Sequence, residues 1–379
     1  MKAPREITAA AARRIWLHAQ RLDTRTPFGD GPEATRRAVA HLGYVQIDTI
    51  NVIERCHHHI LFTRIPGYRR TDLSTAQTGD KSVFEYWTHA LSYVPTSDLP
   101  FYLPAMKRHQ ADPSQWYANA DPAELAKMMR RIRTDGPISI REVDDDALQE
   151  KDHLWASRKP TKKVLQLGFY NGQLAISQRQ GMLKSYELMD RHFGWPPRPR
   201  AASARQVDDY LLDRALRSQG LISAASVMYP RLRFSPEILA LLDGRVRRKT
   251  VLPVRVAGDD TAYWAEPAML EALPESDPLT HILSPFDPLI IQRKRTQRLF
   301  GYDHVFEAYV PKEKRRFGYF TLPVLVGNEI VAALDLKTDR AAGKLLIQAW
   351  HWVGTGTAAA HKAAIDTELE RFERFQLGE

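Results

Sequence analysis

The chain has 379 residues, of which 44% are hydrophobic, 26% charged and 9% aromatic, so wholesale disorder is excluded and roughly two to four folded modules are expected. The 54 lysines and arginines exceed the 45 aspartates and glutamates, and the formal charge of +9 favours a polyanionic partner. The single cysteine, Cys56, excludes an intrachain disulfide, a Cys-rich zinc module and a four-thiolate iron–sulfur cluster, and it suits a reducing cytoplasm. No apolar run approaches the length of about 18 residues that a membrane span needs, and the N-terminus lacks a signal-peptide core.

The first hundred residues contain a helical pattern followed by an apolar strand. We predict a helix over residues 8–20 with Thr8 as its N-cap, a second helix over Glu33–Leu42, and a strand over residues 44–50. Short helices followed by a pair of strands outline a winged helix, which is a helix-turn-helix with a trailing hairpin. Residues 1–120 are therefore assigned to a first, loosely patterned winged-helix unit.

A second copy of this pattern occupies residues 121–195. Its predicted elements are three helices and then two strands, over residues 123–134, 139–146, 161–170, 173–178 and 182–186. Ser139 is the expected cap of the second helix. The Asn171-Gly172 turn leads into the two strands, which would form the wing.

A third copy, over residues 200–270, carries the clearest signals. One helix stops at Gly220, and a second begins at Pro236 with Ser235 as its cap. Two apolar strands then flank a Gly-Asp-Asp turn. Three prolines between residues 195 and 200 form a stiff linker from the second unit.

Beyond residue 275 the pattern changes to short strands at even spacing, separated by Gly-Asn and Asp-Arg turns. This predicts a small antiparallel sheet or barrel over residues 275–379, closed by a helix at residues 357–375. The expected fold class is therefore α+β, with three tandem winged helix-turn-helix units followed by a small C-terminal antiparallel β-barrel.

The sharpest polar pair is Gln46 and Asp48. On a strand, their side chains point to one face, with Cα atoms about 6.5 Å apart. A carboxylate beside an amide can hold a water molecule, and it can accept a proton from that water or face a developing cation. Val45 and Ile47 alternate with the pair as in any half-buried strand, and spacing alone favours that purely structural interpretation.

Three consecutive histidines, His57, His58 and His59, follow the pair. A metal site is disfavoured because adjacent residues rarely converge on one ion and no further carboxylate or thiolate ligand is evident. A polar, DNA-facing or packed role is preferred. Cys56 has no evident general base, so we predict an unreactive buried thiol.

Aromatic side chains surround His89 in the segment Phe84–Pro95. Trp87 and Tyr93 could stack on a nucleotide or shield a cleft. A core helix with one buried histidine accounts for the segment equally well.

Basic runs recur in the separate modules. They comprise Arg245, Arg247, Arg248 and Lys249 near the third hairpin, Arg293, Lys294, Arg295 and Arg298, and Lys312, Lys314, Arg315 and Arg316. Charge runs are often only solvated faces. Their recurrence, together with the positive net charge, favours a surface that follows DNA phosphates.

The chain resembles the AlkZ/YcaQ family of winged-helix DNA glycosylases. The resemblance is carried by Gln46-Ile47-Asp48 within VQIDTINVIERCHHHILFTR, by Tyr86-Trp87-Thr88-His89, and by SPFDPLIIQRKRTQRLFGYDHVFEAYVPKEKRRFGYFTLPVL, and it is collinear over essentially the whole chain. It implies three winged-helix units on a concave, C-shaped scaffold followed by a small β-barrel.

The same resemblance implies excision of alkylated bases, chiefly N7-alkylguanines, and in some members unhooking of interstrand crosslinks. The family's catalytic signature is glutamine, an aliphatic residue, then glutamine or aspartate. This chain has the aspartate form, which is similar to the crosslink-unhooking branch, so the resemblance places Gln46 and Asp48 in the catalytic site. N7-alkylguanine is already cationic and leaves readily, so one carboxylate can suffice. No lysine occurs between Tyr44 and Leu61, and a monofunctional glycosylase is expected.

We expect double-stranded DNA carrying alkylated or crosslinked guanine as the partner, no metal or other cofactor, a monomer, and a cytoplasmic, nucleoid-associated location. The candidate DNA-binding residues are Asn51, Arg55, His57, His59, Trp87, His89, Arg245, Arg247, Arg248, Lys312, Lys314, Arg315 and Arg316. Two alternatives stay open from the residues alone. One is a non-catalytic winged-helix transcriptional regulator, and the other is an architectural or damage-sensing protein that binds distorted DNA without cleaving it.

Overall fold

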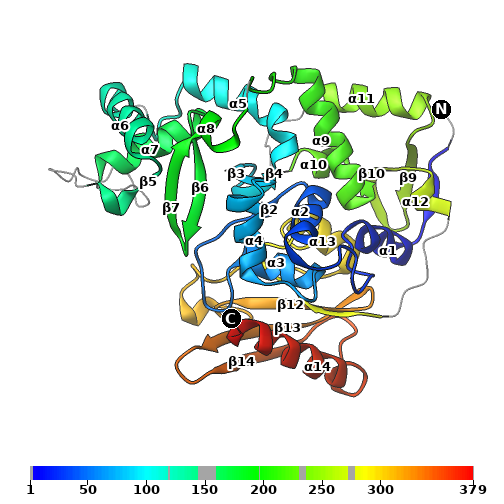
Figure 1. Ribbon diagram of the computed structural model, residues 1–379. Coiled ribbons are helices and arrows are strands. Elements are labelled where there is room, and N and C mark those ends of the chain that lie inside the picture. The colour runs from blue at the N-terminus through cyan, green and yellow to red at the C-terminus, as the bar shows by residue number, and fades with distance from the viewer. Residues whose placement is uncertain are drawn as a thin grey trace. The chain divides into compact units, whose positions relative to one another are not determined.

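The computed structural model describes residues 3–117, 120–143, 159–195, 197–229, 236–271 and 278–378 (Figure 1). The chain divides into two compact units: the first comprises Met1–Arg70 and Asp208–Glu379, and the second comprises Thr71–Val207. Within the described residues, no helix combines the length and the apolar character that crossing a membrane requires.

The N-terminal part of the first unit contains β1 (Arg5–Ile7), α1 (Ala9–Ala19), α2 (Gly31–Leu42), β2 (Val45–Gln46) and α3 (Cys56–Arg64). Both helices predicted here are confirmed. Thr8 caps α1 by accepting a hydrogen bond from the amide of Ala11 (3.1 Å), and Gly43, in the left-handed conformation, ends α2. The predicted strand is shorter than expected, because residues 47–55 form a loop between β2 and α3.

The next elements along the chain of the first unit are α9 (Ala204–Gln219), β8 (Leu221–Ile222), α10 (Ala224–Val227), α11 (Pro236–Arg247), β9 (Leu252–Val256), β10 (Asp259–Ala265) and α12 (Ala268–Glu271). Strands form one sheet in the order β1-β9-β10-β8, with β1 parallel to β9 and the other pairs antiparallel. The helix start at Pro236 and the hairpin are confirmed, whereas Ser235, the expected cap, lies outside the described residues. The N-terminal strand thus joins the sheet of the predicted third winged-helix unit.

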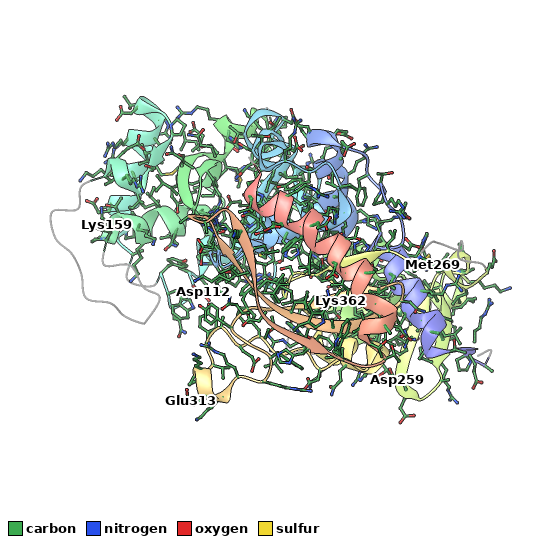
Figure 2. All side chains as sticks on the ribbon, turned by 90° about the horizontal axis from the view of Figure 1, so that it is seen from below. Asp112, Lys159, Asp259, Met269, Glu313 and Lys362 are labelled. Atoms are coloured by element: carbon green, nitrogen blue, oxygen red, sulfur yellow. The ribbon has the colours of Figure 1, made fainter. Side chains whose placement is uncertain are left out.

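The C-terminal part contains β11 (Thr280–Ile282), α13 (Arg293–Phe300), β12 (Thr321–Val326), β13 (Glu329–Asp339), β14 (Lys344–Trp352) and α14 (Ala358–Leu377). The predicted antiparallel sheet and closing helix are confirmed. The predicted barrel is not closed among the described residues, because the strand order β11-β12-β13-β14 leaves β11 and β14 at open edges. Helix α14 lies along the sheet (Figure 2) and buries Ile365, Leu369 and Phe372, so the apolar strands are covered without closure.

The core of the first unit joins segments that are far apart in the sequence. One buried cluster contains Trp16 of α1, Tyr263 of β10, Leu289 of the segment after β11, and Ala333 of β13. Helix α1, the β9–β10 hairpin and the C-terminal sheet therefore share a single hydrophobic core.

The second unit contains a π-helical turn (Thr75–Gly79), β3 (Val83–Trp87), β4 (Leu91–Pro95), α5 (Leu99–Ala111), α6 (Pro122–Asp135), β5 (Ile138–Ser139), α7 (Pro160–Tyr170), β6 (Leu174–Gln180), β7 (Leu183–Leu188) and α8 (Met189–Phe193). Helices α6 and α7 and the β6–β7 hairpin confirm the predicted helices and the predicted strand pair. Ser139 forms a capping box with Glu142 over a 3₁₀ turn, and residues 144–158 lie outside the described part of the chain.

The segment Phe84–Pro95 is a hairpin, so its interpretation as a core helix is wrong. Strands β3 and β4 pair antiparallel, with Val83 opposite Pro95 and Trp87 opposite Leu91. The aromatic and β-branched residues of this segment favour strands. Its buried Glu85 pairs with Arg179 of β6 (2.5 Å), and this ion pair joins the β3–β4 hairpin to the β6–β7 hairpin.

Candidate active site

Asp48 lies in the loop of residues 47–55, here called the Asp48 loop, two residues after β2 ends. Its Oδ1 accepts a hydrogen bond from the amide of Ile50 (2.8 Å), a local turn that aspartate favours. The side chain is half-buried. Burial raises the pKa of Asp48, and the backbone amides of Ile50 and Thr49 oppose this increase only in part. The carboxylate is therefore a stronger base than an exposed aspartate.

Gln46 and Cys56 lie before and after Asp48 in the sequence, at the end of β2 and the start of α3. Gln46 is 6% exposed, and its backbone carbonyl accepts a hydrogen bond from the Cys56 thiol (3.1 Å). Cys56 is the first residue of α3 and is buried, as predicted. Burial raises the pKa of the Cys56 thiol, and the nearby Asp48 carboxylate raises it further, so the thiol stays protonated. Asp48 lies beyond the strand, so its position depends on the loop rather than on strand alternation.

One side of the Asp48 loop is fixed to the C-terminal sheet. The guanidinium of Arg340, directly after β13, donates hydrogen bonds to Oδ1 of Asn51 (3.0 Å) and to the backbone carbonyl of Ile53 (2.8 Å). The amide of Thr338 donates to the carbonyl of Val52 (2.9 Å). The side-chain oxygen of Asn51, a predicted DNA contact, is therefore engaged within the protein.

The end of the loop is fixed through Glu54, which is 5% exposed. Arg70 pairs with Glu54 (2.5 Å) and also donates to the backbone carbonyl of Phe375 in α14 (2.9 Å). The other Glu54 oxygen accepts a hydrogen bond from the amide of Arg55 (2.8 Å). The Arg55 side chain, another predicted DNA contact, is half-buried at the N-cap position of α3.

His57 and His59, which the sequence predicted as DNA contacts, are both buried. His57 is 3% exposed, and its ring packs against His58. His59 is fully buried, and its Nε2 lies 2.8 Å from the carbonyl of Ile282. Burial lowers the pKa of His59 to about 4, so the ring is neutral and donates to that carbonyl. Of the roles considered for these histidines, their burial supports packing in the protein interior.

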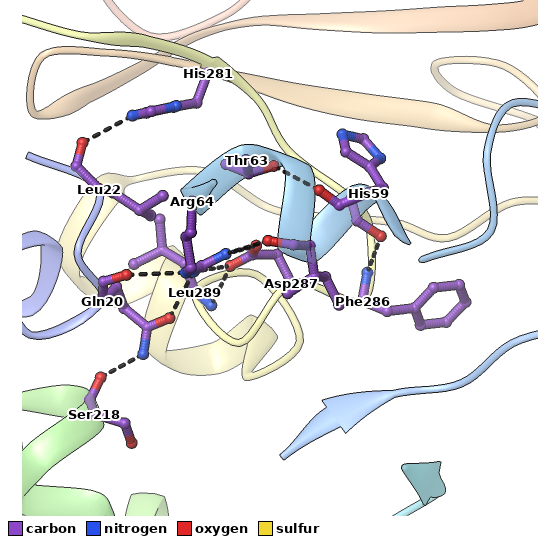
Figure 3. Close-up of polar contacts among 12 residues, drawn as sticks. Gln20, Leu22, His59, Thr63, Arg64, Ser218, His281, Phe286, Asp287 and Leu289 are labelled. Atoms are coloured by element: carbon purple, nitrogen blue, oxygen red, sulfur yellow. Dashed lines mark hydrogen bonds and ion pairs between the residues drawn. The ribbon is translucent and has the colours of Figure 1, made fainter. Parts of the chain in front are cut away.

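An ion pair with no solvent exposure anchors the far end of α3 (Figure 3). The guanidinium of Arg64 binds both carboxylate oxygens of Asp287 (2.7 and 3.0 Å) and the side-chain oxygen of Gln20 (2.9 Å). Asp287 also accepts a hydrogen bond from the amide of Leu289 (2.9 Å). The motif SPFDPLII thus fixes the helix that follows the Asp48 loop.

A second loop, residues 303–319, carries a cluster of cations and is here called the basic loop. The buried carboxylate of Glu307 accepts hydrogen bonds from the amides of Arg316 (2.5 Å) and Phe317 (2.7 Å), which join the beginning of the loop to its end. Tyr309 is 69% exposed on this loop. Slight burial raises the pKa of the Tyr309 hydroxyl, and the negative charge of Asp48 raises it further.

The predicted phosphate-binding cations of this loop face solvent. Lys312 and Lys314 are exposed in a 3₁₀ turn, and Glu313 of that turn lies at the periphery in Figure 2. The Arg316 guanidinium is exposed and pairs with Asp303 (3.2 Å). Arg315 is half-buried, and its guanidinium lies over the ring of Tyr319 (4.9 Å). The basic loop therefore combines cations with the exposed rings of Tyr309 and Tyr319.

The remaining candidates lie elsewhere in the two units. Arg247 and Arg248 are exposed at the end of α11, whereas Arg245 pairs with Asp209 and Asp213 (3.1 and 2.5 Å). The charge of Arg245 is thus largely compensated inside the protein.

In the second unit, Trp87 is 50% exposed at the end of β3 and packs against Tyr170 (6.2 Å between ring centroids). His89 occupies the β3–β4 turn and is half-buried, with its Nδ1 3.3 Å from the Thr88 hydroxyl.

Two residues were missed by sequence reasoning: Arg340, which fixes the Asp48 loop, and Tyr309, an exposed tyrosine of the basic loop. Arg340 follows an ordinary strand and has no motif that marks it. Tyr309 is part of the aromatic and basic run that was singled out for its cations alone, so that run offered a usable signal. Among the residues that the structure describes, no group of three or more histidine, cysteine, aspartate or glutamate side chains is arranged to hold a metal ion.

Comparison with known proteins identifies a matching family model and a solved structure of similar fold. A family model described as "DNA glycosylase AlkZ-like" matches residues 39–375, a range that includes the Asp48 loop and the basic loop. The fold is similar to that of the solved structure of Streptomyces sahachiroi DNA glycosylase AlkZ, with a TM-score of 0.67 and 16% sequence identity over 98% of this chain and 97% of that one.

Proposed function

Because the chain belongs to the family of AlkZ-like DNA glycosylases, which act on N-glycosyl bonds, we propose that it hydrolyses the bond between deoxyribose and N7-alkylated guanine. Its substrates would include guanines joined in interstrand crosslinks. The observation that carries the proposal is Asp48, a half-buried carboxylate of raised pKa in a loop that Arg340 and Arg70 hold in place.

The proposed chemistry needs one carboxylate. Alkylation at N7 makes guanine a cation, so the base departs without protonation by a general acid. As it departs, positive charge develops on the sugar, which an adjacent carboxylate stabilises. Asp48 also accepts a proton from the attacking water, and its raised pKa makes it a better base for that step. Gln46 assists by orienting the water or the sugar.

The cations of the basic loop suit a polyanionic duplex. Lys312, Lys314 and Arg316 are exposed on the basic loop, and we propose them as phosphate contacts. We propose Arg247 and Arg248 as further phosphate contacts.

The experiment measures release of 7-methylguanine from a duplex, and unhooking of a nitrogen-mustard crosslink, by protein without added metal or nucleotide. Asp48→Asn keeps the shape of the side chain and removes its charge. It should lower the single-turnover rate by about 10²- to 10⁴-fold and leave duplex affinity nearly unchanged.

The matched control is Asp303→Asn, the same substitution at an exposed aspartate of the basic loop, and it should keep the wild-type rate at saturating protein. Undiminished base release by Asp48→Asn would remove the proposed catalyst. No base release by the wild type, together with binding to one preferred sequence, would favour the transcriptional regulator.

A further inference from the structure

Four ring side chains of the second unit form one group, here called the aromatic cluster: Trp87, His109, Tyr117 and Tyr170. Tyr170 is in contact with each of the others, and its ring centroid lies 6.2 Å from that of Trp87. His109 and Tyr117 lie 5.6 and 5.5 Å from the same ring. Three of the four side chains are half-buried, whereas Trp87 is 50% exposed. The indole is therefore the part of the cluster that a ligand can reach most readily.

The aromatic cluster rests on the core of the second unit. The hydroxyl of Tyr86, which is 4% exposed, donates a hydrogen bond to the backbone carbonyl of Tyr170 (2.7 Å). The buried ring of Phe169 also packs against Tyr170 (5.0 Å between centroids). Trp87 itself lies opposite Leu91 in the β3–β4 pair. These contacts hold the indole from the protein side, while half of its surface stays open to solvent.

The surroundings of the exposed indole indicate what kind of partner covers it. A tryptophan that stays half exposed among other rings marks an interaction surface, because burial of such a side chain would otherwise be favourable. Lys107 and Arg108, both exposed, directly precede His109 in α5. Aromatic rings are common in protein–protein interfaces, but lysine is depleted there. Rings beside cations are typical of proteins that bind unpaired nucleotides, and this chain belongs to a family that acts on DNA.

We propose that Trp87 stacks on an unpaired nucleobase of DNA and that Lys107 and Arg108 bind the phosphates beside that base. Every base has a π face, so the stacking does not depend on sequence. Unpaired bases occur where a duplex is distorted, and excision of one base leaves its former partner unpaired. The inference goes beyond the proposed function, because it requires neither Asp48 nor release of a base.

The test compares two duplexes that differ only in one nucleobase. Both carry a single-nucleotide bulge. In one duplex the extra nucleotide is deoxyadenosine, and in the other it is a tetrahydrofuran spacer, which keeps the phosphates and lacks the base. Neither duplex contains an alkylated base, so the outcome is independent of the proposed function. Dissociation constants are measured for the full-length wild type and for Trp87→Leu, Trp87→Phe and Trp195→Leu.

Trp87→Leu should weaken binding of the adenine bulge by roughly 5- to 150-fold and should leave binding of the spacer bulge nearly unchanged. Trp87→Phe keeps a ring and should lose less affinity for the adenine bulge than the leucine variant does. Trp195→Leu is the matched control, since the ring of this half-buried tryptophan of the same unit is already stacked on Phe193 (4.3 Å between centroids, interplanar angle 8°). It should affect both duplexes equally.

The two cations are tested by replacing Lys107 and Arg108 together by glutamine. This variant should weaken binding of both bulges by the same factor, because both contain the same phosphates. It should also reduce the slope of log affinity against log salt by about 0.9 for each phosphate that the protein no longer neutralises. An unchanged slope would refute the role of these cations.

The stacking proposal is overturned if Trp87→Leu weakens binding of both bulges by the same factor or of neither. Misfolding is checked by circular dichroism, and a measurement on the wild type keeps the proposal testable even if the leucine variant fails to fold. In that measurement 5-iodouracil replaces the unpaired base, and irradiation joins it covalently to an aromatic side chain on which it stacks. Mass spectrometry should place the crosslink at Trp87. A crosslink only to residues outside the aromatic cluster would overturn the proposal.

Discussion

Asp287→Asn is predicted to destabilise the first unit strongly, because it leaves the buried Arg64 guanidinium without a counter-charge. All five N–H donors of Arg64 have partners: Gln20 accepts two hydrogen bonds, the carbonyl of Ile60 one, and Asp287 two. The asparagine amide would place a donor against a donor and remove the negative charge from a site with no exposure. Breaking such a pair costs about 3–5 kcal/mol of the free energy of unfolding, which urea titration followed by circular dichroism and tryptophan fluorescence would measure.

The control is again Asp303→Asn, which removes a pair with Arg316 whose side chains are 54% and 58% exposed. Screening by water should limit its cost to under about 1 kcal/mol. In a double-mutant cycle, Arg64→Met should lower the free energy of unfolding less in the Asp287→Asn variant than in the wild type. The reason is that the double variant leaves no buried charge unpaired. Equal costs for the two asparagine variants, both under about 1 kcal/mol, would refute the reasoning.

Two further predictions concern activity and binding. The rate of base release should fall as pH is lowered through the pKa of Asp48, because only the ionised carboxylate stabilises the sugar cation. Burial raises that pKa, so the rate of base release should begin to fall at a higher pH than it would for an exposed aspartate. Spontaneous base release is subtracted before the rates are compared. A rate that stays constant down to pH values near the ordinary aspartate pKa would contradict this prediction. Replacing Arg315 and Arg316 by glutamine should weaken DNA binding and reduce the slope of log affinity against log salt by about 0.9 for each phosphate that the protein no longer neutralises. The control is Arg36→Gln, at an exposed arginine of α2 that is paired with Glu33. An unchanged slope in the Arg315 and Arg316 variant would place the basic loop away from the duplex.

Local patterns in the sequence predicted most of the helices and hairpins. Helix α1 forms where its cap and apolar positions indicate it, and the β6–β7 and β9–β10 hairpins follow their turn residues. These elements depend on neighbours within a few residues, so periodicity and capping suffice. The error at Phe84–Pro95 arose because a short apolar and aromatic run fits a strand or a helix equally well.

The sequence also determined by itself that this chain carries the Gln46 and Asp48 pair, a single cysteine and a cation-rich segment, because these are properties of residue type and short spacing. Only the tertiary structure decided which of them meet. Asp287 lies 223 residues from Arg64 along the chain, and Arg340 reaches the Asp48 loop from the C-terminal part of the first unit. The same packing buried His57 and His59. Contacts between distant segments follow from the burial of a shared core, and no local pattern of residues encodes which distant partner that core will bring to a given side chain.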